Sequence, residues 1–180
     1  MVETNPATHR LRPAVPGDAP VIVRLLATVA AEGTLGLSPA DLDERREAQR
    51  LASLDLRQAC ALVAEIDGGI SGAAIAVRGS DASTAHTASV ALWVAASARR
   101  RGAGRLLLRG LQAWAGSAGV RKLCAGVLRH NDAALALFHS SGYLLEGIRR
   151  GQVAVGDGFA DEVLFGLALV AATGEGGGVR

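Results

Sequence analysis

Aromatic residues are scarce in this 180-residue chain: they make up 3% of it, with three phenylalanines, two tryptophans and one tyrosine. So few rings do not provide the stacking surface on which proteins bind single-stranded nucleic acid. An excess of charge of either sign is missing too, since the formal net charge is only +2. A nearly neutral protein has no general electrostatic attraction to nucleic acid or to membranes. We therefore expect neither of them as a partner.

Cysteine and long apolar runs are also in short supply. The two cysteines, Cys60 and Cys124, each lie in an apolar segment, which favours buried, reduced thiols over a disulfide framework. No apolar run reaches the length of a transmembrane helix, and the first ten residues contain no apolar signal core. These absences predict a cytoplasmic location. The spacing of metal ligands or of a serine–histidine–acid triad is not found either, so we expect no bound metal.

What the chain does contain is a regular succession of strand and helix signals. Apolar residues make up 49% of it, which fits a globular domain with its own core. The periodicity of these residues predicts the order β-α-α-β-β-β-α-β-α-β-β. Asp18 is predicted to cap the first helix, and Ser38 and Pro39 to begin the second. We interpret residues 8–170 as a single α+β domain with a mixed sheet and flanking helices, and residues 1–7 and 171–180 as flexible termini.

The most informative segment is ARRRGAGRLLLRG, residues 98–110, in which three arginines and two closely spaced glycines precede a leucine-rich helix. The first N–H groups of a helix have no partners within it, and the helix dipole adds partial positive charge there. Gly102 and Gly104 carry no Cβ atom, so an oxyanion can approach their backbone. Four arginines are able to add charge-assisted hydrogen bonds: Arg99, Arg100, Arg101 and Arg105. This pattern predicts a phosphate site; the alternative is a surface turn whose arginines face water.

The glycine turn does not match the common nucleotide-binding loops. A Walker A loop would continue with Gly-Lys-Ser/Thr, which the chain lacks here. A dinucleotide-binding turn would have a third glycine where Leu107 stands, and it would belong to the first βαβ unit. A nucleotide or dinucleotide binder stays open as an alternative.

Residues 86–150 resemble the core of the GCN5-related N-acetyltransferase (GNAT) family. The family's turn, Arg/Gln-x-x-Gly-x-Gly/Ala, is matched by residues 99–104, and its second signature, Asn-x-x-Ala-x-x-Leu-Tyr-x-x-x-Gly-Phe, by residues 131–143. The spacing between the two signatures fits, and so does the order of elements over residues 10–170. The resemblance implies the acyl-CoA N-acyltransferase fold, with α/β/α layers around a mostly antiparallel sheet of about seven strands.

The resemblance also implies a function: an enzyme that transfers acetyl from acetyl-CoA directly to a primary amine of a small molecule or of a protein N-terminus. The pyrophosphate would bind the backbone of the glycine turn. The pantetheine arm would enter a gap between the strand that ends at Val94 and the next parallel strand. The implied cofactor-binding residues are Leu92, Trp93, Val94, Arg99, Arg100, Arg101, Gly102, Ala103, Gly104, Arg105, Asn131, Ala134 and Phe138. A homodimer is expected from family habit alone, and no residue identifies the amine acceptor.

The residues that move protons are less evident. A primary amine is mostly protonated at neutral pH, so a base has to take its proton. The candidates are His86 at the start of the strand that ends at Val94, Glu32 at the end of the first helix, and Glu162 in the last strand. Many family members carry a tyrosine that protonates the leaving thiolate, but Phe138 stands at that position here. This difference leaves a non-catalytic acyl-CoA sensor as the alternative function.

Overall fold

Residues 9–34 and 42–169 are those that the computed structural model of the chain describes. They form seven strands and four α-helices, which follow one another in the order predicted from the sequence. The elements are β1 (His9–Pro13), α1 (Ala19–Ala31), α2 (Glu44–Ala52), β2 (Ala59–Ile66), β3 (Gly69–Arg78), β4 (Thr87–Val94), α3 (Ala103–Ser117), β5 (Lys122–Leu128), α4 (Asp132–Ser140), β6 (Leu144–Val155) and β7 (Gly158–Ala168).

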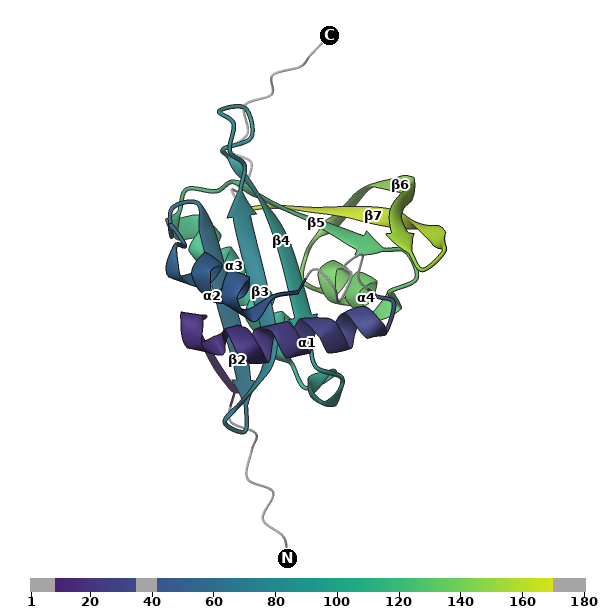
Figure 1. Cartoon of the computed structure of the whole chain (residues 1–180). Coiled ribbons are helices and arrows are strands. Elements are labelled where there is room, and N and C mark those ends of the chain that lie inside the picture. The colour runs from purple at the N-terminus through teal and green to yellow at the C-terminus, as the bar shows by residue number, and fades with distance from the viewer. Residues whose placement is uncertain (1–8, 35–41, 170–180) are drawn as a thin grey trace, which may run out of the picture.

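The seven strands form one sheet in the order β1-β2-β3-β4-β5-β7-β6. Every neighbouring pair is antiparallel except β4 and β5, which are parallel and are joined through α3. The prediction of a mixed, mostly antiparallel sheet of about seven strands is therefore confirmed. Figure 1 shows the β6–β7 hairpin at one side of the molecule and β2 and β3 at the other.

Helices pack on both faces of the sheet. Apolar side chains of α3 and α4 pack on one face in a core that includes Leu107, Leu111 and Phe138. On the other face, α1 and α2 pack in a second core with side chains of β2 and β3, and both helices lie in front of these strands in Figure 1. Strand β4 serves both cores because its side chains alternate: Ala88 and Val90 join the first, and Trp93 packs against the second.

Asp18 lies at the predicted cap position of α1, but its carboxylate does not accept a hydrogen bond from the helix. It accepts instead from the Val15 N–H at 2.9 Å and from Arg12 Nη1 and Nη2 at 2.6 and 2.9 Å. These bonds lower the pKa of Asp18, with the Arg12 contact as the main cause. Arg12 also donates to Glu65 of β2 at 2.7 Å. The side chain predicted as a cap thus connects the start of α1 to the sheet.

Helix α2 is shorter than predicted. The proposed start at Ser38 and Pro39 lies outside the described residues, and the helix begins at Glu44. Asp43 is the N-cap, since its carboxylate accepts from the backbone N–H of Arg46 at 2.7 Å. Glu44 and Glu47 in the first turn add negative charge where the helix dipole is positive. This local chemistry fixes the start of α2 at a later residue than the proline pattern indicated.

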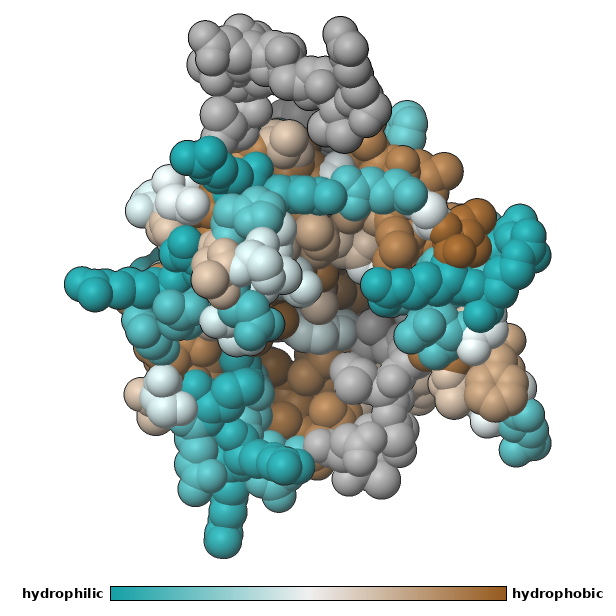
Figure 2. Space-filling view, turned by 90° about the horizontal axis from the view of Figure 1, so that it is seen from above, coloured by the Kyte–Doolittle hydropathy of each residue, from teal (hydrophilic) through white to brown (hydrophobic). Residues whose placement is uncertain are grey.

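The molecular surface seen from above is mostly hydrophilic, but hydrophobic residues are visible at the bottom of a hollow near its middle (Figure 2).

The two cysteines lie inside the fold to different degrees: Cys60 is buried, whereas Cys124 is half-buried, and both are free thiols. Burial raises the pKa of the Cys60 thiol to about 11. Of the two predicted buried cysteines, only Cys60 is fully buried.

Candidate functional site

Strands β4 and β5 are paired only at their first residues. The parallel register joins Thr87, Ala88 and Ser89 of β4 to Lys122, Leu123 and Cys124 of β5 and stops there. The last residues of both strands therefore have no ladder between them, although each strand stays paired with its other neighbour. Unpaired backbone groups at the centre of a sheet need another partner. This gap corresponds to the one that the resemblance implied.

The unpaired edge of β4 offers the backbone of Leu92 and Val94. The N–H of Ala95 donates to Ser71 on the β3 side at 2.9 Å. Because backbone groups alternate in direction along a strand, those of Leu92 and Val94 point the other way, toward β5. Val94 O has one contact there, with Arg99 Nε at 3.4 Å. An extended ligand arm in the gap would find free backbone donors.

The glycine turn leads from this gap into α3 and leaves the start of the helix open. Gly102 is the N-cap residue and has a φ of 92°, a conformation that favours glycine, and no side chain caps the helix. The first turn contains no acidic residue. The N–H groups of Ala103, Gly104 and Arg105 therefore point out of the helix without a capping side chain. A helix start of this kind is suited to bind an anion.

Gly104 lies against a neighbouring helix. A Cβ atom at this position would lie 2.8 Å from Leu137 Cδ2 of α4, so a larger residue would displace this leucine side chain. The approach of an anion to the Gly104 backbone stays a prediction. At Gly102 a Cβ would meet only His9 at 3.8 Å, and the constraint there is the positive φ. The two glycines thus have separate tasks, one in backbone conformation and one in helix packing.

The four arginines of the turn do not act as one cluster. Arg99 forms an ion pair with Glu32 at the end of α1, and Arg101 forms one with Asp67 in the β2–β3 turn at 2.7 Å. Both ion pairs are partly exposed, and contact of Arg99 and Arg101 with the anion stays a prediction. Arg100 and Arg105 have no ion pair among the described residues.

Residues at the end of α1 bridge the two sides of the gap. Glu32 is held by Arg99 after β4, while Gly33 O contacts His130 Nε2 after β5 at 2.9 Å. Asn131 Nδ2 donates to Thr34 O at 3.4 Å, and its Oδ1 accepts from the N–H of Ala134 at 3.1 Å. Asn131 is therefore the cap of α4. Contact with the cofactor stays a prediction for Asn131 and Ala134. His130 belongs to no sequence motif, and its place directly before Asn131 is the only signal that could have indicated it.

Phe138 belongs to the core. Its ring is 4% exposed and packs edge-to-face on Tyr143 at 5.0 Å and stacks on Phe165 at 5.8 Å. The prediction that Phe138 contacts the cofactor is therefore not supported by its placement. Tyr143, the nearest phenol, is 1% exposed, and burial raises its pKa to about 12, so it does not replace the missing tyrosine as an acid at the gap.

His86 is excluded as the base by its position. It directly precedes Thr87, the first residue of β4, and its carbonyl accepts from the N–H groups of Arg121 and Lys122. The gap lies at the opposite end of β4, near Val94. At ~3.3 Å per residue, eight strand residues span about 26 Å. An exposed side chain at that distance does not reach an amine in the gap, and the prediction for His86 is wrong.

Glu162 lies beside the unpaired part of β5. It pairs with Leu128, the last residue of β5, and its side chain lies across Gly126 on the sheet face that α1 and α2 cover only in part. A Cβ at Gly126 would overlap the Glu162 carboxylate. One carboxylate oxygen accepts from Arg149 Nη1 at 3.2 Å, and the side chain is 20% exposed.

Two other acidic side chains near the gap are, like Glu162, in ion pairs. Glu32 is tied to Arg99. Asp161 accepts from the backbone N–H of Gly151 at 3.0 Å and from Arg129 at 3.2 Å, and these bonds lower its pKa, the backbone bond most. Because neighbouring strand residues point to opposite faces, Asp161 turns away from the face that carries Glu162. Of these three carboxylates, that of Glu162 lies beside the unpaired part of β5.

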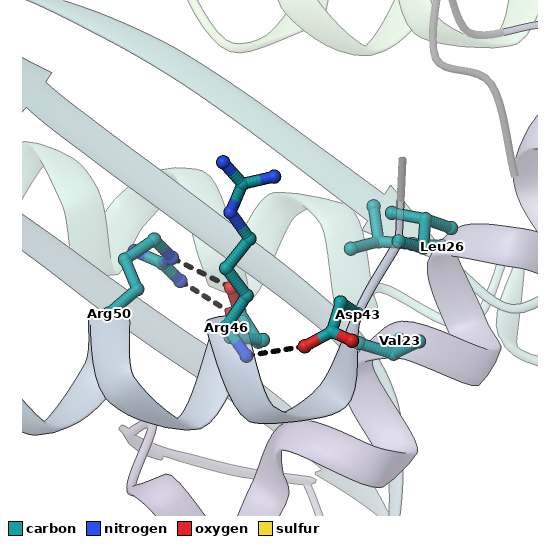
Figure 3. Close-up of a pocket in the computed structure, with 7 residues that line it drawn as sticks. Val23, Leu26, Asp43, Arg46 and Arg50 are labelled. Carbon is teal, nitrogen blue, oxygen red and sulfur yellow. Dashed lines mark hydrogen bonds and ion pairs between the residues drawn. The ribbon is translucent and has the colours of Figure 1, made fainter. Parts of the chain in front are cut away.

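A cavity of about 310 Å³ lies elsewhere, between α1 and α2 (Figure 3). Its lining combines apolar residues with the start of α2: Val23, Leu26, Leu42, Asp43, Arg46, Glu47 and Arg50. Figure 3 shows Arg50 paired with an acidic neighbour, whereas the guanidinium of Arg46 has no partner among the residues drawn. The cavity shares no residue with the glycine turn or with the β4–β5 gap.

Metal ligands do not gather in this structure: within residues 9–34 and 42–169, no three His, Cys, Asp or Glu side chains are placed to hold an ion. In the same part of the chain, no helix has both the length and the apolar character needed to cross a bilayer.

Comparison with known proteins places the geometry in a family. The model of the acetyltransferase (GNAT) family matches residues 30–143, which include β4, the glycine turn, α3, β5 and α4. A sequence search among curated proteins found no significant match.

Among solved structures, the yncA protein of Salmonella typhimurium, solved with its cofactor acetyl-CoA, has a TM-score of 0.83 and 21% identity over 96% of this chain and 99% of its own. The phosphinothricin acetyltransferase of Sinorhizobium meliloti, in complex with acetyl-CoA, has a TM-score of 0.82 and 21% identity. The match covers 96% of this chain and 95% of that protein. The ribosomal-protein-alanine N-acetyltransferase of Brucella melitensis has a TM-score of 0.80 and 27% identity. The match covers 88% of this chain and 99% of that protein.

Proposed function

The chain belongs to the acetyltransferase (GNAT) family, and from this premise we propose that it transfers the acetyl group of acetyl-CoA to a primary amine. One observation carries the proposal: the unpaired ends of β4 and β5 lead directly into a glycine turn at which α3 starts without a capping side chain. An extended arm with a pyrophosphate at one end fits this arrangement. The fit comes from free backbone donors of the described chain, at Leu92, Val94 and the first turn of α3.

Acetyl-CoA supplies an activated thioester, and the residues of the chain have to bind it, place the amine and take up the amine's proton. The N–H groups of Ala103, Gly104 and Arg105 would hold the pyrophosphate, with Arg100 and Arg105 as the nearby arginines that lack an ion pair among described residues. The backbone N–H of Val94 would donate to the thioester oxygen, where negative charge develops during transfer. We assign to Arg99 and Glu32 the task of fixing the turn against α1.

Glu162 is the proposed base. Its carboxylate lies beside the unpaired part of β5, and the absence of a side chain at Gly126 allows it to lie flat on the sheet. The ion pair with Arg149 holds its orientation. A general base in this position contributes about 10²- to 10⁴-fold to the rate.

The amine acceptor is proposed at the level of a class: a primary amine of a small molecule or of a protein N-terminus. Both kinds are named among the similar structures, one as a phosphinothricin acetyltransferase and one as a ribosomal-protein-alanine N-acetyltransferase. A homodimer is proposed as well, supported by exposed apolar side chains on the hairpin at the sheet edge: Leu144, Leu145, Ile148 and Phe159. Light scattering on the purified protein tests the dimer.

The function is tested by incubating the purified protein with acetyl-CoA and a panel of amines: amino acids, polyamines, aminoglycosides and peptides with free N-termini. Release of the coenzyme A thiol together with mass gain of one acetyl group on an amine is the expected result. Tight binding of acetyl-CoA without transfer to any amine would favour the non-catalytic sensor instead. Absence of binding would reject both.

A further inference from the structure

The free ends of β4 and β5 have no strand ladder to fix the distance between them. Their last paired residues are Ser89 and Cys124, so beyond these the two backbones are not joined to each other. On the face covered by α3, Leu92 of β4 and Leu137 of α4 both lie beside Gly104, within 4 Å of where its Cβ atom would be. On the opposite face, the end of α1 connects the two sides through polar contacts. The width of the gap therefore depends on an apolar contact on one face and a polar bridge on the other.

The end of α1 has the conformation that this bridge needs. Gly33 has a φ of 68°, a left-handed conformation that ends a helix and favours glycine. Its N–H completes the last turn by donating to Ala30 O at 3.0 Å. The carbonyl groups of Gly33 and Thr34 then point out of the helix, and both accept from residues that follow β5: from His130 at 2.9 Å and from Asn131 at 3.4 Å. In Figure 1, α1 accordingly runs across the front of the strands toward α4.

His130 is the member of the bridge whose only side-chain hydrogen bond among the described residues is this one. Because a carbonyl oxygen can only accept, the proton in the contact with Gly33 is carried by Nε2. Asn131, in contrast, also caps α4, and Glu32 closes the β4 side through Arg99. Removal of the imidazole therefore releases the bridge on the β5 side and leaves α4 and the glycine turn unchanged.

The bridge lies on the side from which an amine would approach. In the proposed function, the pyrophosphate binds the start of α3 on one face of the sheet, and the acyl arm fills the gap. The opposite face carries α1 and the proposed base, Glu162. An amine between this base and the thioester would lie next to the end of α1. Since transfer needs the reacting atoms at about 3–3.5 Å, a wall that shifts would misplace the amine.

We infer that His130 is a positioning residue for acetyl transfer. Its hydrogen bond to Gly33, with the Arg99–Glu32 ion pair on the other side, holds the end of α1 across the gap and fixes the wall against which the acceptor amine binds. The inference rests on the proposed function, because it concerns the amine side of that site. Loss of the hydrogen bond should therefore raise the KM for the amine and leave the affinity for acetyl-CoA unchanged.

The test compares three substitutions of His130 by what they do to the N–H donor. His130→Ala removes it. His130→Gln keeps an N–H donor separated from Cβ by two atoms, as Nε2 is, whereas His130→Asn places the donor one atom closer, as Nδ1 is. With the amine that the wild-type protein acetylates fastest, the alanine and asparagine variants should raise KM about fivefold and change kcat by less than about twofold. The glutamine variant should restore the wild-type KM.

Two further measurements accompany the kinetics. The Kd for acetyl-CoA, measured by calorimetry, should stay within about twofold of wild type in all three variants. Hydrogen–deuterium exchange needs no activity: the amides at the end of α1, that of Gly33 included, should exchange faster in His130→Ala and recover protection in His130→Gln. His139→Ala is the matched control, because His139 is also an exposed histidine but lies in the last turn of α4. It should change none of these quantities.

The possible failures are distinguishable. If the wild-type protein acetylates no amine, the proposed function is rejected, and the positioning role with it. If the wild type is active and His130→Ala has an unchanged KM, the positioning role is overturned while the proposed function stands. An equal rise of KM in His130→Gln and His130→Ala would show that the hydrogen bond to Gly33 is not the cause and would also overturn it. Weaker binding of acetyl-CoA by His130→Ala would place the residue on the cofactor side, against the inference.

Discussion

Replacing Gly126 by alanine moves the proposed base without removing it. The new methyl group would occupy space that the Glu162 carboxylate now fills, and the carboxylate is the movable partner because it ends a flexible side chain. The φ angle of Gly126 is not positive, so alanine fits the strand backbone. The substitution should therefore displace the carboxylate and leave the fold intact.

The expected size of the effect follows from the role of the displaced group. Loss of a general base lowers the rate by about 10²-fold or more, which corresponds to about 2.7 kcal/mol in the activation free energy. The stability change should be small, since the ion pair that is lost, Glu162 with Arg149, is partly exposed and contributes about 0–1 kcal/mol. We expect kcat to fall by about 10²-fold, with an unchanged melting temperature and unchanged affinity for acetyl-CoA.

The assay measures kcat for acetyl transfer by Gly126→Ala, Glu162→Gln and the double variant. If both substitutions act through one carboxylate, the double variant should be no slower than Glu162→Gln alone. Gly147→Ala is the control, because a Cβ there meets no atom within 4 Å. Full activity in Glu162→Gln would show that Glu162 is not the base and would refute the reasoning.

Three further outcomes are expected from the structure. Gly102→Ala forces a side chain into a left-handed conformation, which should cost about 1–2 kcal/mol of unfolding free energy and weaken acetyl-CoA binding; denaturation and calorimetry measure the two effects. Arg12→Met leaves the Asp18 carboxylate enclosed without its cation and should destabilise the protein by about 2 kcal/mol. The folded-state pKa of Asp18 is lowered, so its contribution is present above the unfolded pKa of about 4 and lost as the pH falls; in acid denaturation this loss should be smaller for Arg12→Met. The pKa of Cys60 is raised to about 11 in the folded state, so its thiol stays protonated at pH values where the unfolded thiol ionises. The free energy of unfolding should therefore decrease from about pH 9 to about pH 11. A Cys60→Ala variant should lose that part of the decrease.

Periodicity and turn residues were sufficient to predict the order of the elements. Leu107 and Leu111, four residues apart, lie on the buried face of α3, and the turn between β2 and β3 has positive φ at both Asp67 and Gly68. Local chemistry also identified the glycine turn. These features depend on residues close together in the chain, which is why the sequence alone reveals them.

The side chains around the gap could not be assigned in the same way. Arg99 pairs with Glu32, which is 67 residues earlier in the sequence, and this pairing depends on how α1 packs against β4. The position of Glu162 over Gly126 depends on the register between β5 and β7. For His86 the error was different: its chemistry suited a base, but strand geometry puts it at the wrong end of β4.

The measurement that tests the central claim most directly is the melting temperature of the purified protein with and without saturating acetyl-CoA, with NAD and ATP as controls. At a hundred times its Kd, a ligand stabilises the folded state by about 2.7 kcal/mol, which corresponds to a rise of about 5–10 °C in a domain of this size. We predict that rise for acetyl-CoA alone, and its loss in a folded Gly102→Glu variant, whose carboxylate would occupy the pyrophosphate site. An unchanged melting temperature with acetyl-CoA, or an equal rise with NAD or ATP, would contradict the assignment of the glycine turn to coenzyme A.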